Sequence, residues 1–252
     1  QGIAGHQRLY SSRPASYRSE YAVEYRHREP ELTLVLRGRA DGYDPEQGLV
    51  EEIKTCRVAP DAISANVAEL HLAQGRLYAA IIAAQDKRDG MDVQVTWFNI
   101  DSAEEFHRCE TYSAQELAEF LDSTLSRFSN WLHILARRRR ERDASLSALG
   151  FPYGGFRTGQ REIAELTYKC VDQGGQLLLE APTGIGKTSA VLFPALKALA
   201  TNKHDKVVFL TAKTVGRRAA ESTLADLAAA GYRGNALSLT AKEKICLSPG
   251  RA

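Results

Sequence analysis

The stretch Gly38–Thr55, "GRADGYDPEQGLVEEIKT", places charged side chains among apolar residues that alternate with period two. In its second half, "GLVEEIKTC" alternates so that Glu52 and Lys54 share one face of a strand, and Asp41 comes from the end of the preceding strand. Charges on buried strands are costly unless something compensates them, and carboxylates bind divalent cations well. The stretch therefore predicts a metal site built on β-strands.

The composition allows a buried core but does not identify a partner. Of the 252 residues 44% are hydrophobic, and 33 basic against 31 acidic residues leave a net charge of only +2. The charge of the whole chain therefore neither requires nor excludes nucleic acid as a partner. The longest apolar run, Tyr78–Ala84, is too short to span a bilayer, and the start shows no secretory signal pattern. Because the chain begins at Gln1 and its single methionine is Met91, we expect a fragment that lacks the start of the protein.

The cysteines indicate a reducing compartment. They are scattered through the chain without a C-x-x-C pair, at Cys56, Cys109, Cys170 and Cys246. This spacing argues against a disulfide scaffold and favours the cytoplasm.

The first part of the chain reads as a mixed α/β domain. The alternating segments 20–27 and 31–38 predict an antiparallel hairpin, residues 66–85 have helical spacing, and residues 92–100 return to a strand. A long helix is expected from about Ser113 to Leu146 and contains the basic run "ARRRRERD". For this run, a solvated helix face and a phosphate-contacting role are equally open.

The pattern changes near Gly150, where the Gly- and Pro-rich loop "LGFPYGGFRTGQ" indicates a domain boundary. Beyond it, helices alternate with the apolar segments 176–181 and 206–212, which are predicted to be strands. Alternating strands and helices are typical of a parallel α/β sheet. We therefore divide the chain into domains 1–149 and 150–252.

A phosphate-binding loop follows the first of these strands, in "APTGIGKTS", and opens a helix. The residues predicted to hold the nucleotide are Thr183, Gly184, Gly186, Lys187 and Thr188. The glycines let backbone N–H groups close around phosphate oxygens, Lys187 reaches the β- and γ-phosphates, and Thr188 offers its hydroxyl to Mg²⁺. The loop departs from the strict pattern at Ala181, where a glycine is usual. This context predicts a site for ATP with Mg²⁺.

Three motifs in this second part resemble the XPD/DinG-like iron–sulfur DNA helicases of superfamily 2. "FPYGGFRTGQ" is similar to their adenine-recognition segment, with Arg157 and Gln160 near the base, and "VVFLTAKTVGRRAAE" is similar to a motif that touches single-stranded DNA. "AKEKICLSPG" resembles the place where that family supplies the first cysteine of a [4Fe–4S] cluster, here Cys246. The resemblance covers about Phe151–Ala252 and implies ATP-driven translocation on DNA, in the 5′-to-3′ direction. The sequence ends before a D-E-A-H box.

The first part resembles the RecB-like branch of the PD-(D/E)xK nucleases, over roughly Gln1–Trp131. "GIAGH" matches the element whose histidine, here His6, is a metal ligand, and Gln74 and Tyr78 match a Q-x-x-x-Y element. The residues that the resemblance makes metal ligands are His6, Asp41, Glu52 and the carbonyl of Ile53, and the catalytic residues are Asp41, Glu52, Lys54, Gln74 and Tyr78. Ala40 replaces the proline that names the superfamily. Glycines 38 and 42 are expected to let a phosphate backbone approach.

Together these features predict a RecB-like, restriction-endonuclease-type nuclease core followed by the start of a RecA-like P-loop motor domain. We expect Mg²⁺- or Mn²⁺-dependent cleavage of DNA, single-stranded or with single-stranded ends, coupled in the intact protein to unwinding in DNA repair. Exonuclease and endonuclease cleavage are both open. A first alternative is an ATP-dependent helicase whose N-terminal fold only docks DNA. A second is a restriction-type endonuclease coupled to a translocase, which needs a target-recognition domain that the sequence does not show.

Overall fold

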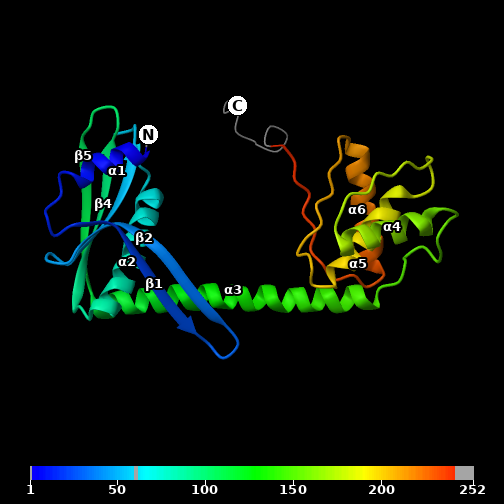
Figure 1. The fold of residues 1–252 in the computed structure, drawn as a ribbon, viewed down its shortest axis with the longest axis horizontal. Coiled ribbons are helices and arrows are strands. Elements are labelled where there is room, and N and C mark those ends of the chain that lie inside the picture. Colours follow the sequence, from blue (N-terminus) through cyan, green and yellow to red (C-terminus); the bar gives the residue numbers. More distant parts are fainter. Residues whose placement is uncertain (1, 60–61, 242–252) are drawn as a thin grey trace. The chain divides into compact units, whose positions relative to one another are not determined.

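The computed structural model describes residues 2–59 and 62–241, which form two compact units, Gln1–Leu132 and His133–Ala252 (Figure 1). Each unit has its own core. No helix among the described residues is both long enough and apolar enough to cross a membrane.

The first unit is built on a five-stranded sheet in the order β1-β2-β3-β4-β5. Its strands are β1 (Arg18–Arg28), β2 (Thr33–Asp44), β3 (Leu49–Cys56), β4 (Gly90–Asn99) and β5 (Glu105–Ser113). Neighbouring strands are antiparallel except β3 and β4, which are parallel and are joined by the helix α2 (Ala65–Asp86). A parallel pair needs such a crossover because the chain must return to the same end of the sheet. The predicted hairpin, third strand, helix and following strand are thus confirmed.

The edge strand β5 was not predicted. Its sequence, "EFHRCETYS", is polar at most positions, and its residues alternate between exposed and half-buried. An edge strand needs to bury only one face and one row of backbone groups, so its side chains carry a weak apolar signal.

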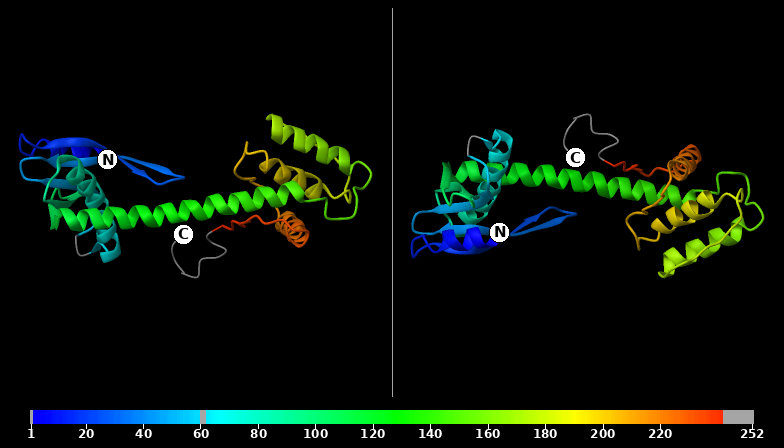
Figure 2. Two further views of the ribbon diagram at one scale, coloured as in Figure 1. Left: turned by 90° about the horizontal axis from the view of Figure 1, so that it is seen from below. Right: turned by 90° about the horizontal axis from the view of Figure 1, so that it is seen from above.

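The turn between β2 and β3 is held by Asp44, whose Oδ1 accepts the backbone N–H groups of Glu46 and Gln47 at 2.9 and 3.2 Å. Within the described residues β2 pairs with β3 at three positions only, from Gly42↔Glu51 to Asp44↔Leu49. The rest of the β1–β2 hairpin therefore continues as a two-stranded ribbon (Figures 1 and 2). This early separation of β2 from β3 positions the site described below.

Two helical layers cover the sheet. On one face, α2 and the first turns of α3 (Ala114–Ala148) bury a core that includes Val50, Val93 and Leu121. On the other face, α1 (Gly2–Tyr10) packs Leu9 against Ile53 and a neighbouring phenylalanine of β4. Because side chains alternate along a strand, Val50 and Ile53 of β3 point to opposite faces.

The second unit packs the C-terminal turns of α3 against α5 (Lys187–Leu199) and α6 (Thr214–Ala229), and α4 (Gln160–Gln173) contacts α5. The Lys197 ammonium group donates to the carbonyls of Leu146, Ser147 and Leu149 at 2.6–3.1 Å. These carbonyls lie in the last turn of α3 and directly after it, so a cation there both caps the helix and joins it to α5.

The two strands predicted for this unit are absent from the described residues of the unit. Segments 176–181 and 206–212 have no strand pairing there, and Leu178 and Leu210 are 100% and 87% exposed. Parallel strands are stable only with paired neighbours and helices on both faces, and here neither apolar segment has that cover. The strand prediction is therefore wrong for this structure, although the helices between the strands form as expected.

The basic run on α3 has a structural role in part. The Arg139 guanidinium lies 2.8 Å from the Asp205 carboxylate, and Arg142 donates to the Asp205 carbonyl at 2.8 Å. These contacts attach α3 to the second unit, so the division between compact units falls inside this helix at His133. The domain boundary at Gly150 lies two residues beyond the end of α3 and stays a prediction.

Candidate functional site

The fork where β2 and β3 separate is occupied by the Asp41 carboxylate. Beyond Glu51 the backbone of β3 no longer pairs with β2, and the Ile53 N–H donates to Asp41 Oδ2 at 2.7 Å. The carboxylate thus replaces a strand partner and is held in one orientation. The Ile53 side chain is buried below α1, while its backbone lies at the fork.

His6 reaches the same fork from α1. Its Nδ1 lies 3.6 Å from Asp41 Oδ1 and 3.4 Å from the hydroxyl of Tyr10, one turn later on the helix. An imidazole and a carboxylate on adjacent elements can share a divalent cation, and an imidazole ligand favours Mn²⁺ over Mg²⁺.

Glu52 and Lys54 project together from β3, as the alternation predicts. Lys54 Nζ lies 2.5 Å from Glu52 Oε1 and donates to Gln74 Oε1 on α2 at 3.1 Å. The other carboxylate oxygen of Glu52 is buried and has no hydrogen-bond partner among the described residues. A buried carboxylate oxygen without a donor is costly, and a cation would remove that cost. A divalent cation would supply the partner that this oxygen lacks, although Glu52 does not belong to the described group of ligand atoms within 4.8 Å of one another, which is His6, Glu20 and Asp41.

The ionisation of the two carboxylates agrees with this geometry. Burial raises the pKa of Glu52 to about 7; the hydrogen bond from Lys54 opposes the rise, and the charge of Asp41 adds to it. Burial also raises the pKa of Asp41, against the Ile53 N–H and His6. Carboxylates whose pKa values are raised by burial and by a neighbouring negative charge are typical of functional sites.

Gln74 and Tyr78 both lie on α2, but in the described part of the chain only Gln74 hydrogen-bonds to Lys54. Tyr78 instead covers Gly38: a Cβ on that glycine would meet the tyrosine ring at 2.7 Å. A Cβ on Gly42 would meet the Tyr17 hydroxyl at 1.7 Å. Both glycines are therefore closed by tyrosines, and the expectation that they admit a phosphate backbone is wrong. Their small size serves close packing within the first unit.

Two acidic residues near the fork were not identified from the sequence. The first is Glu20 on β1: one of its carboxylate oxygens and the ligand atoms of His6 and Asp41 all lie within 4.8 Å of one another. Glu51 lies on the opposite face of β3 from Glu52, fully buried. Neither has a local sequence signal, because each obtains its role from a distant strand or loop.

Glu51 is the centre of a buried polar network. Its carboxylate accepts Arg13 Nε and Nη2 at 2.9 and 2.6 Å and the Tyr17 hydroxyl at 2.7 Å. Burial acts to raise its pKa, but the hydrogen bonds from Arg13, Thr96 and Tyr17 outweigh burial and hold the pKa below its usual value. The network attaches the loop between α1 and β1 to the sheet, and this loop joins the elements that carry His6 and Glu20.

In the second unit, the predicted nucleotide residues surround the start of α5. Gly184 and Gly186 have φ of +84° and +86°, which only glycine adopts readily, and α5 begins at Lys187. Lys187 Nζ donates to the carbonyls of Ala181 and Pro182 at 2.9 and 2.8 Å. The loop leads directly into a helix N-terminus, which is a favourable place for phosphate groups.

Thr183 and Thr188 flank this turn. Thr183 is exposed, and Thr188 is the second residue of α5 and is half-buried. Both stay predicted nucleotide ligands.

The two residues expected near the base contact the phosphate loop. Arg157 Nη1 donates to the Gly184 carbonyl at 2.6 Å, and the buried Gln160 donates through Nε2 to Ser189 Oγ at 3.2 Å. Gln160 Oε1 also accepts the Arg157 N–H at 3.0 Å. The loop before α4 is thereby joined to the phosphate loop. Cys246, the predicted cluster ligand, lies outside the described residues.

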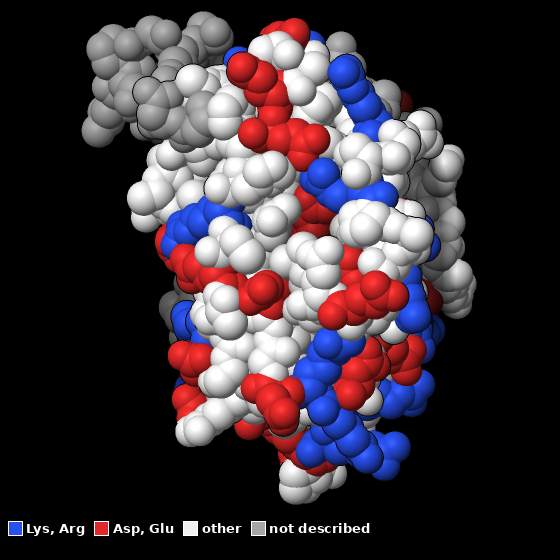
Figure 3. Space-filling view, turned by 90° about the vertical axis from the view of Figure 1, so that its left-hand side faces the viewer, with Lys and Arg blue, Asp and Glu red and all other residues white. Residues whose placement is uncertain are grey.

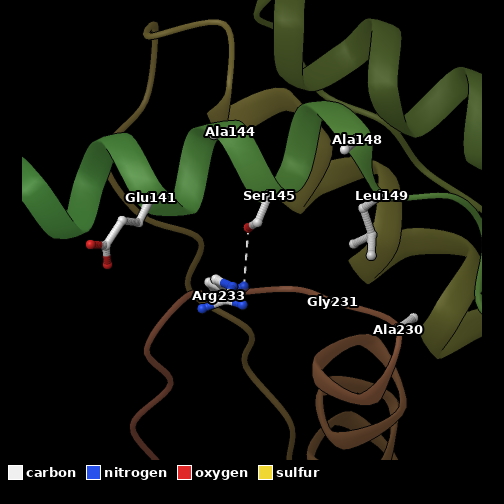
Figure 4. A pocket seen from close by; sticks show the side chains of 8 residues that line it. All are labelled: Glu141, Ala144, Ser145, Ala148, Leu149, Ala230, Gly231 and Arg233. Carbon is white, nitrogen blue, oxygen red and sulfur yellow. Dashed lines mark hydrogen bonds between the residues drawn. The ribbon is translucent and has the colours of Figure 1, made fainter.

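A surface groove of about 450 Å³ lies between the end of α3 and residues 230–233 (Figure 4). Ala144, Ala148 and Leu149 give it an apolar wall, and Ser145 Oγ accepts the Arg233 N–H at 3.0 Å. None of the predicted site residues lines this groove.

On the face of the first unit drawn in Figure 3, acidic and basic side chains are interspersed.

Comparison with known proteins gives matches in the second part of the chain. Residues 158–230 match the family model "DEAD/DEAH box helicase", so this segment is similar to the helicases of that class. More particularly, 61 residues are 38% identical to a probable ATP-dependent helicase of Methanocaldococcus jannaschii. That match covers 24% of this chain and 9% of the length of the relative. Among solved structures, the crystal structure of SSO0001 matches with a TM-score of 0.34 and 16% identity over 50% of this chain and 58% of the other, a likeness too low to support an inference.

Proposed function

We propose that the first unit is a metal-dependent DNA nuclease and that, in the intact protein, it works with an ATP-driven DNA helicase motor. The single observation that carries the nuclease assignment is the arrangement at the β2–β3 fork. There Asp41 accepts the Ile53 N–H, and Glu52 keeps one buried oxygen without a partner beside Lys54. Carboxylates and a lysine at such a fork are the groups that phosphodiester hydrolysis needs.

A bound Mg²⁺ or Mn²⁺ supplies Lewis acidity and lowers the pKa of a coordinated water. The residues that hold it in this proposal are His6, Asp41, Glu52 and the Ile53 carbonyl. Asp41 is already oriented by the Ile53 N–H, so it needs no rearrangement to act as a ligand.

Lys54 is the group that meets the substrate. Gln74 and Glu52 hold its ammonium from two elements, α2 and β3. If Glu52 were to hold a cation, Gln74 would still orient Lys54, which would align the attacking water and stabilise the negative phosphate. Tyr78 supports the site indirectly, because its ring packs over Gly38 on β2.

For the motor, we infer ATP binding at the start of α5. Lys187 exchanges the Ala181 and Pro182 carbonyls for β- and γ-phosphate oxygens, and Thr188 contributes to the Mg²⁺ that accompanies ATP. Arg157 and Gln160 connect the adenine side to the phosphate loop. The resemblance to XPD/DinG-like helicases supports single-stranded DNA as the track, a [4Fe–4S] cluster with Cys246 as one ligand, and a role in DNA repair.

The second candidate function is a DNA-docking module without cleavage. The observation that favours it is the contact of 2.5 Å between Lys54 and Glu52, which is also what a purely structural ion pair would show. The buried Glu52 oxygen without a partner argues for the nuclease, since a structural pair gains nothing from leaving it unsatisfied.

The test is cleavage of end-labelled single- and double-stranded DNA by this chain with Mg²⁺ or Mn²⁺ and without ATP. We expect cleavage that is abolished by chelation and in Asp41→Ala and Glu52→Ala. Glu24→Ala, which removes a surface carboxylate from β1, is the matched control and should cut normally. An inactive wild type with both metals on both substrates, or active Asp41 and Glu52 variants, would leave the docking module as the better candidate.

A further inference from the structure

The backbone of β1 is irregular at one residue, Glu20. On both sides of it β1 pairs with β2 in one register, from Arg18↔Tyr43 through Ser19↔Gly42 and again from Tyr21↔Ala40. At the position between them, where Glu20 corresponds to Asp41, the two strands are not paired, and Glu20 has a φ of +55°. This left-handed conformation is disfavoured for residues with a side chain, and such outliers cluster at functional sites.

The irregular backbone brings the Glu20 carboxylate to the fork. Ligand atoms of His6, Glu20 and Asp41 all lie within 4.8 Å of one another. The Glu20 oxygens accept the Tyr10 hydroxyl at 3.0 Å and Arg39 Nη1 at 3.3 Å, and these contacts hold the carboxylate beside His6.

A second observation points to a ligand at this place. The buried Glu52 oxygen has no partner among the described residues, and Glu52 and Asp41 are each one position beyond the last β2–β3 pair, Gly42↔Glu51. Glu20, Asp41 and Glu52 therefore form a row across three adjacent strands, at a strand spacing of about 4.8 Å. Asp41 is in the middle, with a carboxylate on either side; His6 lies beside Asp41, Lys54 beside Glu52 and Arg39 beside Glu20.

We propose that Glu20 is a metal ligand that completes a second cation position at the fork. His6, Glu20 and Asp41 form one position, Asp41 and Glu52 form the other, and Asp41 bridges the two. Paired metal positions in phosphodiester hydrolysis lie about 3.5–4 Å apart, a separation that one bridging carboxylate spans. The imidazole in the first position favours Mn²⁺ there. This inference rests on the proposed nuclease function for its purpose but concerns metal binding alone.

The experiment measures Mn²⁺ binding to the chain without DNA or nucleotide, by calorimetric titration and by the loss of the free Mn²⁺ signal in electron paramagnetic resonance. Glu20→Asn is the informative variant, because asparagine tolerates the left-handed conformation but removes the carboxylate. We expect about two Mn²⁺ ions per chain for the wild type and about one for Glu20→Asn. Asp41→Ala, which removes the bridge, should lose both.

The matched control is Glu24→Gln, which removes the same charge from the same strand. Glu24 pairs with Arg26 and Arg37 at the surface and has no contact with the fork, so this variant should keep both ions. Equal stoichiometry and affinity in Glu20→Asn and the wild type, or a wild type that binds a single ion which Glu20→Asn retains, would overturn the proposal. If Glu20→Asn does not fold by circular dichroism, Glu20→Gly replaces it, since glycine accepts the same φ.

The two proposals fail in different ways. Two ions that depend on Glu20 in a chain that cuts no DNA would retain the metal assignment and refute the nuclease. Metal-dependent DNA cleavage by a chain whose Mn²⁺ binding is the same with and without the Glu20 carboxylate would support the nuclease and refute the second cation position.

Discussion

Replacing Arg13 by leucine should lower the free energy of unfolding of the first unit more than the loss of any single surface charge. Arg13 is the main partner of Glu51, with two hydrogen bonds of 2.9 and 2.6 Å, and Glu51 is fully buried. Removing one partner of a buried ion pair leaves an uncompensated charge and costs about 3–5 kcal/mol. With a urea m-value of about 1.5 kcal/mol/M, the midpoint of unfolding falls by about 2–3 M.

The chain offers a direct assay for this change. Its two tryptophans, Trp97 and Trp131, both lie in the first unit, so fluorescence during urea unfolding reports on that unit. Arg26→Leu is the control, because Arg26 forms a comparable ion pair with Glu24 but is exposed, and exposed pairs contribute little. If Arg13→Leu and Arg26→Leu shift the midpoint equally, the buried network does not anchor the loop that joins α1 to β1.

Three further outcomes are expected. Gly38→Ala should lower the unfolding free energy of the first unit by about 1–3 kcal/mol and reduce cleavage, because its Cβ meets the Tyr78 ring at 2.7 Å. Gly155→Ala, where the structure has open space, is the control; equal stability of the two variants would contradict this packing argument. Lys187→Ala in the intact protein should abolish ATP turnover but leave metal-dependent cleavage of short single strands, measured in parallel; loss of both in a folded variant would show one coupled site. The intact protein should purify with about four irons per chain, and Cys246→Ala should reduce unwinding more than cleavage; a variant that unwinds normally with full iron–sulfur absorbance would exclude Cys246 as a ligand.

The sequence by itself predicted the parts of the protein that have local signals. The alternation in β1, β2 and β3 assigned their faces, and the helical spacing of residues 66–85 predicted α2 nearly to its ends. The loop before α5 could be read in the same way, because glycines, a lysine and a threonine at fixed spacing need only their own backbone to form a phosphate site. Lys54 and Gln74 were assigned to one site only by the family resemblance; the hydrogen bond between them is a finding of the structure.

Only the tertiary structure decided the relations that depend on distant residues. Glu51 and Glu52 are adjacent and chemically identical, yet one is neutralised by Arg13 and the other keeps an oxygen without a partner, because alternate positions of a strand face different layers. The left-handed backbone that brings Glu20 to the fork has no sequence signal. Gly38 was interpreted as open and is covered by Tyr78 from another element. Local spacing specifies which groups a segment can offer, whereas packing of separate elements specifies which of those groups meet. The proposed metal site at the fork depends on such packing, because its residues come from three strands and a helix.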